Sequence, residues 1–266
     1  MRRRSGSLDG LPRRFRGLYS ADDRTKGKRV ASDVEVKVLS TTAMKMVFEE
    51  LSPRFAQETG YRLDVSLGAS AQLEARLDQG EVADVAILTA PGAKDLAARG
   101  KLAAASLREV ARSSIGVAVR KGAPKPDISS VEAFKRTMLA ATAIACSKPV
   151  GGGASGVHIA KVFERLGISA AMAPKSKYGG GGTGGLAGLF VVRGEAEIAI
   201  QQMAELMMVD GLDVVGPLPA DIQGITLFTA AIPTSAAHGE TGRVLIDYLA
   251  TPAAKGMITA KGLDPA

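Results

Sequence analysis

Residues that commonly build covalently braced or metal-bound sites are scarce in this sequence. Its 266 residues include one cysteine, two histidines and no tryptophan, and aromatic residues make up 4%. A single cysteine excludes an internal disulfide framework and a cysteine-based zinc site. The apolar runs are all shorter than the ~18 residues that a membrane span needs. With 46% hydrophobic and 23% charged residues, the composition is that of a globular chain.

Positive charge is in excess, and the excess lies entirely in residues 1–32. The formal net charge is +7. The first 32 residues hold ten basic and three acidic side chains, and the rest of the chain holds 24 of each. We expect this basic tail to be disordered, because it lacks periodic apolar spacing. The remainder of the chain is electrically neutral.

Three explanations for the basic tail are left open. It begins like an export signal and contains Arg13-Arg14-Phe15, but no apolar segment follows. A misassigned or altered N-terminus would account for this, and so would a cytosolic protein with a basic arm. Nucleic-acid binding by the tail is the third explanation, and no interleaved aromatic residues support it.

From residue 34 onward, strand patterns alternate with helix patterns. Apolar residues recur at helical spacing in segments that follow short β-rich runs. This order favours an α/β fold with mixed sheets flanked by helices. Strands are expected over 34–39, 61–67, 83–88, 114–120, 141–146, 198–202 and 226–232, and helices over 43–59, 71–79, 93–99, 131–138, 157–166, 186–193, 204–209, 241–249 and 252–261.

Three loops share one design, in which a strand end is followed by small or hydroxyl residues and then a helix. They cover 40–43, 68–71 and 151–156. Helix N-termini present unpaired N–H groups and the positive end of the helix dipole, so converging ones can bind an anion. Ordinary helix capping is the alternative. The candidate ligand residues in these loops are Ser40, Thr41, Thr42, Ala43, Ser70, Ser155 and Gly156.

The glycines of 151–156 match known glycine motifs only in part. Gly151, Gly153 and Gly156 fit G-x-G-x-x-G, but no acidic residue follows about 20 positions on, as a dinucleotide site requires. The segment also lacks the Lys-Ser/Thr of a P-loop and the last glycine of a nucleophile elbow. It predicts either a backbone wrap around a small ligand or a purely structural loop.

Two adjacent amides end an apolar strand. Gln201 and Gln202 follow Ile198-Ala199-Ile200, and buried amides need partners, which a ligand or the neighbouring backbone could supply. Lys45 is a candidate counter-charge or a solvated lysine. Cys146 is expected to be a buried small hydrophobe. For His158 and His238, a surface or capping role is the default.

At these residues the chain resembles the substrate-binding proteins of ABC importers, in the molybdate-binding branch of the type 2 periplasmic binding fold. The likeness runs from about residue 34 to residue 262. That resemblance implies two lobes that close over an anion, with crossings near 116–119 and 214–216. Lobe I would comprise 33–116 and 216–266, and lobe II 117–215. The segments that carry the likeness are 36–40, 83–88, 151–156, 194–199 and 249–254.

The ligand contacts that the resemblance implies fit this sequence in part. One hydroxyl contact falls on Ser70. The other falls on Ala43, which has no hydroxyl, although Ser40 or Thr42 could replace it. The tyrosine of that branch falls at Gln202. Backbone contacts are expected near Ser155 and Thr183.

Residues 201–206 and 215–219 look like a branch that includes both solute binders and aconitate isomerases. Our leading hypothesis is a non-catalytic, periplasmic and monomeric receptor that delivers a molybdate-like oxyanion or a small di- or tricarboxylate to the membrane subunits of an ABC importer. An aconitate isomerase is the first alternative, with no catalytic residue identified. A cytosolic anion-responsive regulator is the second. We expect no cofactor, no metal and no nucleic-acid partner for the leading hypothesis.

Overall fold

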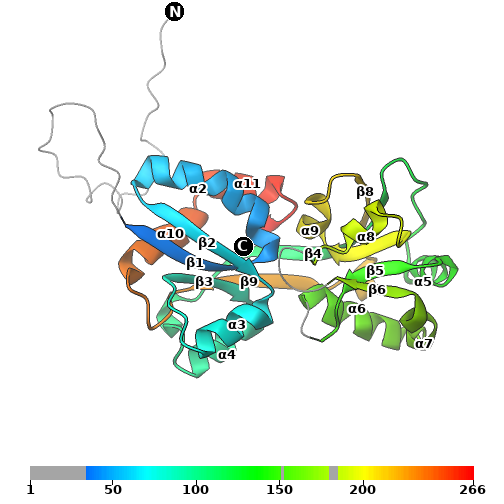
Figure 1. Ribbon diagram of the computed structural model, residues 1–266, viewed down its shortest axis with the longest axis horizontal. Helices are drawn as coiled ribbons and strands as arrows, with labels where there is room; N and C mark the ends of the chain where they lie inside the picture. Colours follow the sequence, from blue (N-terminus) through cyan, green and yellow to red (C-terminus); the bar gives the residue numbers. More distant parts are fainter. Residues whose placement is uncertain (1–33, 151–152, 180–184) are drawn as a thin grey trace, which may run out of the picture.

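A computed structural model describes residues 34–150, 153–179 and 185–266. The basic tail and Thr183 therefore lie outside the described residues. The chain forms two halves side by side, each with helices around a sheet (Figure 1). Among the residues described, no helix is both long and apolar enough to cross a membrane.

The first half is built on the strand order β2-β1-β3-β9-β4. Strand β1 is parallel to β2 and β3, whereas β9 is antiparallel to β3 and β4. A short β10 adds to β4. The bounds are β1 Glu35–Thr41, β2 Arg62–Gly68, β3 Val85–Thr89, β4 Arg108–Arg120, β9 Ile225–Ala231 and β10 Asp264–Pro265.

Amphipathic helices cover this sheet and bury apolar side chains against it. Helix α2 begins after the short turn η1 (Thr42–Met44) and packs Val47, Phe48, Leu51 and Phe55 into the core. The ring of Phe55 meets that of Tyr248 edge-on, with centroids 5.2 Å apart. The helices of this half are α2 Lys45–Thr59, α3 Ser70–Asp78, α4 Ala90–Ala98, α10 Gly239–Leu249 and α11 Pro252–Ala260, with η2 at Ala104–Ser106.

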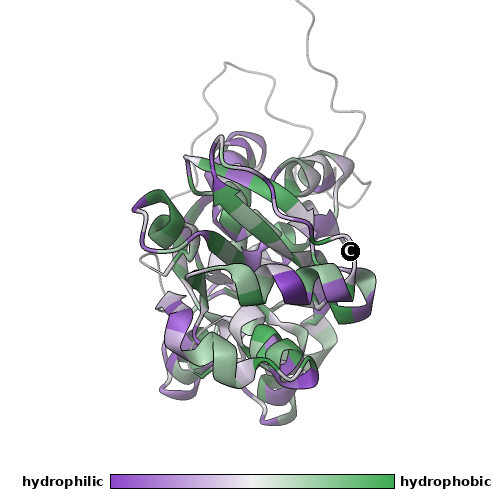
Figure 2. Ribbon diagram, turned by 90° about the vertical axis from the view of Figure 1, so that its right-hand side faces the viewer, coloured by the Kyte–Doolittle hydropathy of each residue, from purple (hydrophilic) through white to green (hydrophobic). Residues whose placement is uncertain are grey.

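The second half is built on β4, β7, β5 and β6, with β8 also paired to β4. Strand β5 is parallel to β6 and β7, and β4 is antiparallel to β7 and β8. Figure 2 shows hydrophobic strands inside and hydrophilic stretches on the outer helices. The bounds are β5 Ile144–Ser147, β6 Ser176–Gly179, β7 Ile198–Gln202, β8 Leu212–Pro217, α5 Val131–Ala140, α6 Ala154–Arg165, α7 Ser169–Met172, α8 Gly188–Val192 and α9 Met203–Met207, with η3 at Ala173–Lys175 and η4 at Ala220–Ile222.

Strand β4 belongs to both halves. Its residues up to Ser114 pair with β9, and from Ile115 onward they pair with β7. The chain returns from β8 to β9 through residues 218–224. Two stretches of backbone thus join the halves in the described chain. The lobe boundaries drawn from the sequence remain a prediction.

The prediction of mixed sheets flanked by helices is confirmed, with corrections at particular strands. The strand predicted over 114–120 begins earlier, at Arg108. Its first part was missed because it mixes exposed charged residues with buried ones and forms no apolar run. The strand predicted over 141–146 begins only at Ile144. Strand β6 was missed because Ser176 and Lys177 give it no apolar signal.

Close packing against backbone atoms explains why position 156 is a glycine. A Cβ at this position would lie 2.4 Å from the carbonyl oxygens of Ser147 and Lys148. Because those atoms are backbone, they cannot rotate away as a flexible side chain would. A glycine is therefore needed where the first turn of α6 crosses the end of β5.

We expect Gly156→Ala to destabilise the fold by about 1–3 kcal/mol, since it places a methyl group against backbone. The matched control is Gly256→Ala in α11, where nothing lies within 4 Å of the added carbon. That change should stabilise the helix by up to about 1 kcal/mol. Thermal or denaturant unfolding of both variants measures the difference, and equal stabilities would contradict the packing argument.

Candidate functional site

A cavity of about 50 Å³ lies where the two halves meet. Parallel strands place their carboxyl ends at one edge of a sheet, and ligands in α/β folds bind outside such ends. Strands β1, β2 and β3 end here from the first half, and β5 and β7 end here from the second. The lining residues are Thr41, Thr42, Ala43, Gly68, Ala69, Ser70, Thr89, Ser147, Gly153, Ala154, Gly185, Leu186, Gln201, Gln202, Glu205 and Phe228.

The cavity gathers many of the residues that the sequence singled out. Six predicted ligand residues line it: Thr41, Thr42, Ala43, Ser70, Gln201 and Gln202. Three others, Ser40, Ser155 and Gly156, are absent from its described walls. Their part in ligand binding remains a prediction, as does that of Thr183.

On the first half, Ser70 is held by the end of β3. Its Oγ accepts a hydrogen bond from the Thr89 backbone N–H at 2.8 Å and donates to Glu74 Oε1 at 3.0 Å. The hydroxyl is therefore already engaged within the protein, and it would have to leave Glu74 to donate to a ligand. Thr41 is the opposite case, since its buried Oγ1 has no hydrogen-bond partner among the residues described.

On the second half, Gln201 ties the cavity wall together. Its Oε1 accepts a hydrogen bond from the Ala187 backbone at 2.8 Å, and its Nε2 donates to Ser147 Oγ at 3.3 Å and to the Gly185 carbonyl at 3.5 Å. Ser147 Oγ also lies 3.3 Å from Ser155 Oγ. Ser155 thus turns toward the protein interior, and the neighbours of Gln201 satisfy much of its amide.

Gln202 leaves one end of its amide free. Its Nε2 donates to Thr226 Oγ1 at 2.7 Å, whereas its buried Oε1 finds no partner within the described part of the chain. A threonine hydroxyl can either accept or donate a hydrogen bond. Rotation of the amide would therefore keep the Thr226 contact and present the NH₂ group to the cavity instead. The Gln202 amide can therefore accept a hydrogen bond from a ligand or donate one to it.

Glu205 is a residue of the cavity wall that the sequence analysis missed. It lies in the first turn of α9, its side chain is half-buried, and its buried Oε2 has no hydrogen-bond partner in the described ranges. Burial raises the pKa of this carboxyl to about 7, and hydrogen bonds from the Gln201 side chain and the Gln202 backbone act in the opposite direction. An acid three residues after a helix N-cap often bonds back to the N-cap backbone. This spacing was the sequence signal that could have pointed to Glu205.

The walls described carry no lysine, arginine or histidine. A bound anion would be met by hydroxyls, amides and the N-termini of α3 and α6 instead. Lys45 pairs with Glu49, and the ring of His158 bonds the Ile222 carbonyl at 2.8 Å. Cys146 is buried, as expected. Within 34–150, 153–179 and 185–266, no group of three or more metal-ligating side chains occurs.

Comparisons with known proteins give one consistent picture. Residues 36–264 match the family described as "Bacterial extracellular solute-binding protein". An aconitate isomerase from Pseudomonas sp. is 35% identical over 234 residues, which are 86% of this chain and 87% of that protein.

Solved structures agree in fold. The periplasmic molybdate-binding protein of Azotobacter vinelandii gives a TM-score of 0.71 at 20% identity, over 86% of this chain and 98% of that one. The sulfate-binding protein SubI of Mycobacterium tuberculosis H37Rv gives 0.69 at 18% identity, over 88% and 87%. At these identities the likeness concerns the fold alone, and it confirms the two-lobed architecture expected from the sequence.

The buried carboxyl makes stability depend on pH in a defined direction. The pKa of Glu205 is about 7 in the folded protein, against an ordinary value of 4.5. The folded state therefore holds the proton more tightly than the unfolded state does. The contribution of Glu205 to the free energy of unfolding is fully present below about pH 4.5 and is lost as the pH rises through 7. Between these limits the loss amounts to about 3 kcal/mol.

We therefore expect Glu205→Gln to lack this pH-dependent loss. Relative to the parent protein, the variant should gain about 3 kcal/mol of unfolding free energy between pH 4.5 and pH 8. Denaturant unfolding at several pH values measures the gain. Glu164→Gln, on the exposed face of α6, is the control and should follow the parent at every pH. A constant difference between Glu205→Gln and the parent would contradict the burial of an ionisable group here.

Proposed function

Because the chain belongs to the family of bacterial extracellular solute-binding proteins, we propose that its cavity binds aconitate and interconverts the cis and trans isomers. The observation that carries this proposal is the Glu205 carboxyl in the cavity wall. A receptor for an anion needs donors only, and a buried carboxyl beside an anion is a cost to it. An isomerase that moves a proton needs such a group.

The pKa of Glu205 suits proton transfer at neutral pH. A general acid–base group works best when its pKa lies near the operating pH, and burial raises the pKa of this carboxyl to about 7. At that pH the group is present in both its charged and its neutral form. Strongly shifted pKa values in a cleft are typical of functional sites.

The remaining groups suit a substrate that becomes more negative as it reacts. Removal of a proton from the methylene carbon of aconitate leaves an allylic carbanion that is stabilised by the attached carboxylates. Fixed donors aimed at developing charge lower the energy of such a state. The N-termini of α3 and α6, the Thr41 hydroxyl and the adaptable Gln202 amide supply these donors.

Access for a tricarboxylate requires motion. The cavity of about 50 Å³ is far below the ~300–1,000 Å³ of sites for drug-sized ligands. Two halves joined by β4 and by residues 218–224 can part by a hinge motion and close again over a ligand. We propose that aconitate enters the parted state and that closure brings it against Glu205.

A receptor for a small oxyanion is the second candidate. The small cavity and the lack of cationic side chains on its described walls favour it, because neutral donors suffice for a compact anion. On this alternative the protein is a periplasmic monomer that delivers the anion to the membrane subunits of an ABC importer.

We expect purified protein to convert cis-aconitate to trans-aconitate, which proton NMR follows directly. Both isomers should raise the unfolding temperature, because a ligand at 100 times its Kd adds about 2.7 kcal/mol of stability. Molybdate and sulfate are the matched alternatives in the same thermal-shift series. Stabilisation by an oxyanion together with no turnover of aconitate would reject the isomerase and favour the receptor.

A further inference from the structure

We propose that the two halves rotate about a hinge at two adjacent points of the backbone, between Ser114 and Ile115 and at Gly224, and that the Gln223 side chain confines the rotation to these points. The inference rests on the parting of the halves proposed above and holds for either candidate ligand. It adds to that motion the residues that bend and the residue that limits the bending.

Strand β4 changes partners between two consecutive residues. Ser114 pairs with Ile225 of β9, which belongs to the first half. Ile115 pairs with Gln202 of β7, which belongs to the second half. The peptide bond between Ser114 and Ile115 is therefore the point at which β4 passes from one sheet into the other.

The returning segment, residues 218–224, is fixed to the second half almost to its end. Ile222 is buried in the core of that half. Helix α6 of the same half binds the segment from outside, because the ring of His158 bonds the Ile222 carbonyl at 2.8 Å. Arg165 Nη1 likewise donates to the Asp221 carbonyl at 2.8 Å. These contacts hold the segment in place up to residue 222.

Gly224 is the joint on this side. The next residue, Ile225, already pairs with Ser114 in the sheet of the first half. A Cβ at Gly224 would lie 2.7 Å from the ring of His158, so a side chain has no room at this point. Because Ser114 and Ile225 are paired, the bend in β4 and the bend at Gly224 lie next to each other, as a single hinge axis requires.

The Gln223 side chain completes the pairing of Ile115. Strand β8 pairs with β4 from Gly116 onward, and β9 pairs with β4 up to Ser114, so Ile115 lies between their ends. Gln223 Oε1 accepts a hydrogen bond from the Ile115 backbone N–H at 2.9 Å, and Gln223 Nε2 donates to the Ile115 carbonyl at 3.0 Å. An amide side chain carries the same donor and acceptor as a peptide group, so Gln223 takes the place of a strand residue beside β4.

Three more hydrogen bonds tie the two crossing segments together. Gln223 Oε1 also accepts from the Gly224 backbone N–H at 2.9 Å, and Gln223 Nε2 donates to the Leu218 carbonyl at 3.4 Å. The Leu218 backbone N–H donates to the Ile115 carbonyl at 3.0 Å. Ile115 and residues 218–223 therefore move as one body with the second half, and rotation is left to the backbone just beyond them.

Loss of these hydrogen bonds would spread the bending over residues 218–224. The halves would then sample many relative orientations, and closure over a ligand would cost more conformational entropy. Gln223 is absent from the described walls of the cavity, so its removal takes no contact from the ligand. Stabilisation of the loop alone is the alternative role of Gln223, and it predicts a change in stability without a change in the motion.

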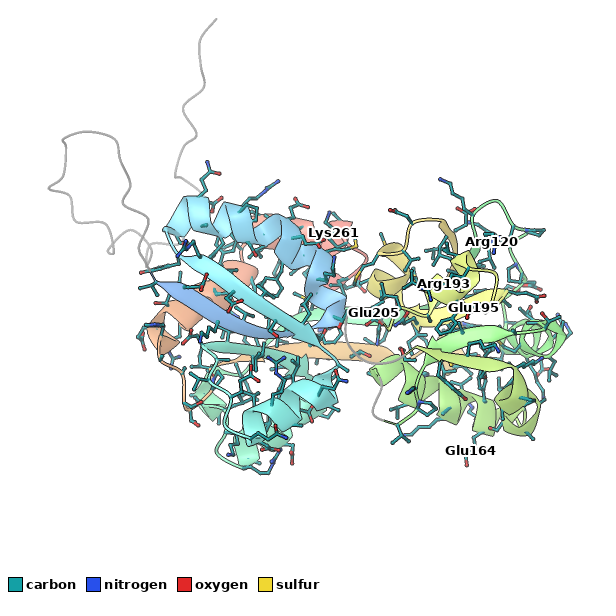
Figure 3. The ribbon with its side chains drawn as sticks, viewed as in Figure 1. Arg120, Glu164, Arg193, Glu195, Glu205 and Lys261 are labelled. Carbon is teal, nitrogen blue, oxygen red and sulfur yellow. The ribbon has the colours of Figure 1, made fainter. Side chains whose placement is uncertain are left out.

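The test measures the distance between the halves with a pair of spin labels, by double electron–electron resonance. Lys94→Cys on α4 and Glu164→Cys on α6 carry the labels, one on each half (Figure 1). Both side chains are exposed, and Figure 3 shows Glu164 pointing away from the body of the second half. The native Cys146 is buried and stays unlabelled.

Gln223→Met keeps the length of the side chain and removes its hydrogen bonds. We expect a broader distribution of distances in the ligand-free variant than in the parent, and a Kd for trans-aconitate or molybdate raised by about 5-fold or more. Phe55→Leu, in the core of the first half, should lower the unfolding temperature and leave both readouts unchanged. Gln79→Met, at an exposed glutamine, should match the parent throughout. An unchanged distance distribution in Gln223→Met would overturn the proposal.

Hydrogen exchange in the parent gives a second readout that does not depend on the folding of a variant. The Ile115 amide should exchange as slowly as the other buried amides of β4, with and without trans-aconitate, because its bond to Gln223 is kept in both states. Exchange at the rate of an exposed amide would overturn the proposal. The distances are measured without ligand, so failure of both trans-aconitate and molybdate to bind would reject the proposed function and leave the result on the hinge standing.

Discussion

Burial of one carboxyl group without a full set of partners is the constraint on which the site depends. Transfer of an ionised group out of water is unfavourable unless charges or hydrogen bonds compensate for it. At Glu205 the described neighbours compensate in part, through Gln201 and the Gln202 backbone, and Oε2 is left without a partner. The fold therefore holds the pKa of this carboxyl at about 7, so its charged and neutral forms are both present at neutral pH.

The architecture creates this constraint by bringing two sheets together end to end. Strand β4 pairs with β9 up to Ser114 and with β7 from Ile115, so the strand ends of both halves face one small space. Gln201 then connects β7 to β5 and to the start of α8 through Ser147 and Ala187. Because these contacts fix the wall rigidly, the adaptable groups are few: the Gln202 amide, the Thr41 hydroxyl and the free oxygen of Glu205.

Much of this arrangement can be predicted from the sequence. The rest cannot, because it depends on tertiary contacts. Apolar periodicity predicts most elements, and small residues at strand ends predict the position of the cavity. Two consecutive exposed charged residues, Arg108 and Glu109, hide the start of β4, which only tertiary pairing reveals. Ser155 Oγ lies 3.3 Å from Ser147 Oγ, a contact between α6 and β5 that depends on tertiary packing. Glu205 resembles an ordinary helix-capping acid, and its burial depends on contacts between distant segments.

Selective observation of the glutamate carboxyl carbons tests the central claim most directly. Carbon NMR of protein labelled at those carboxyls, recorded across pH and compared with Glu205→Gln, isolates the signal of this residue. The account predicts that one signal titrates with a midpoint near pH 7 and vanishes in the variant. A Glu205 signal that titrates below about pH 5, as ordinary carboxyls do, would contradict it.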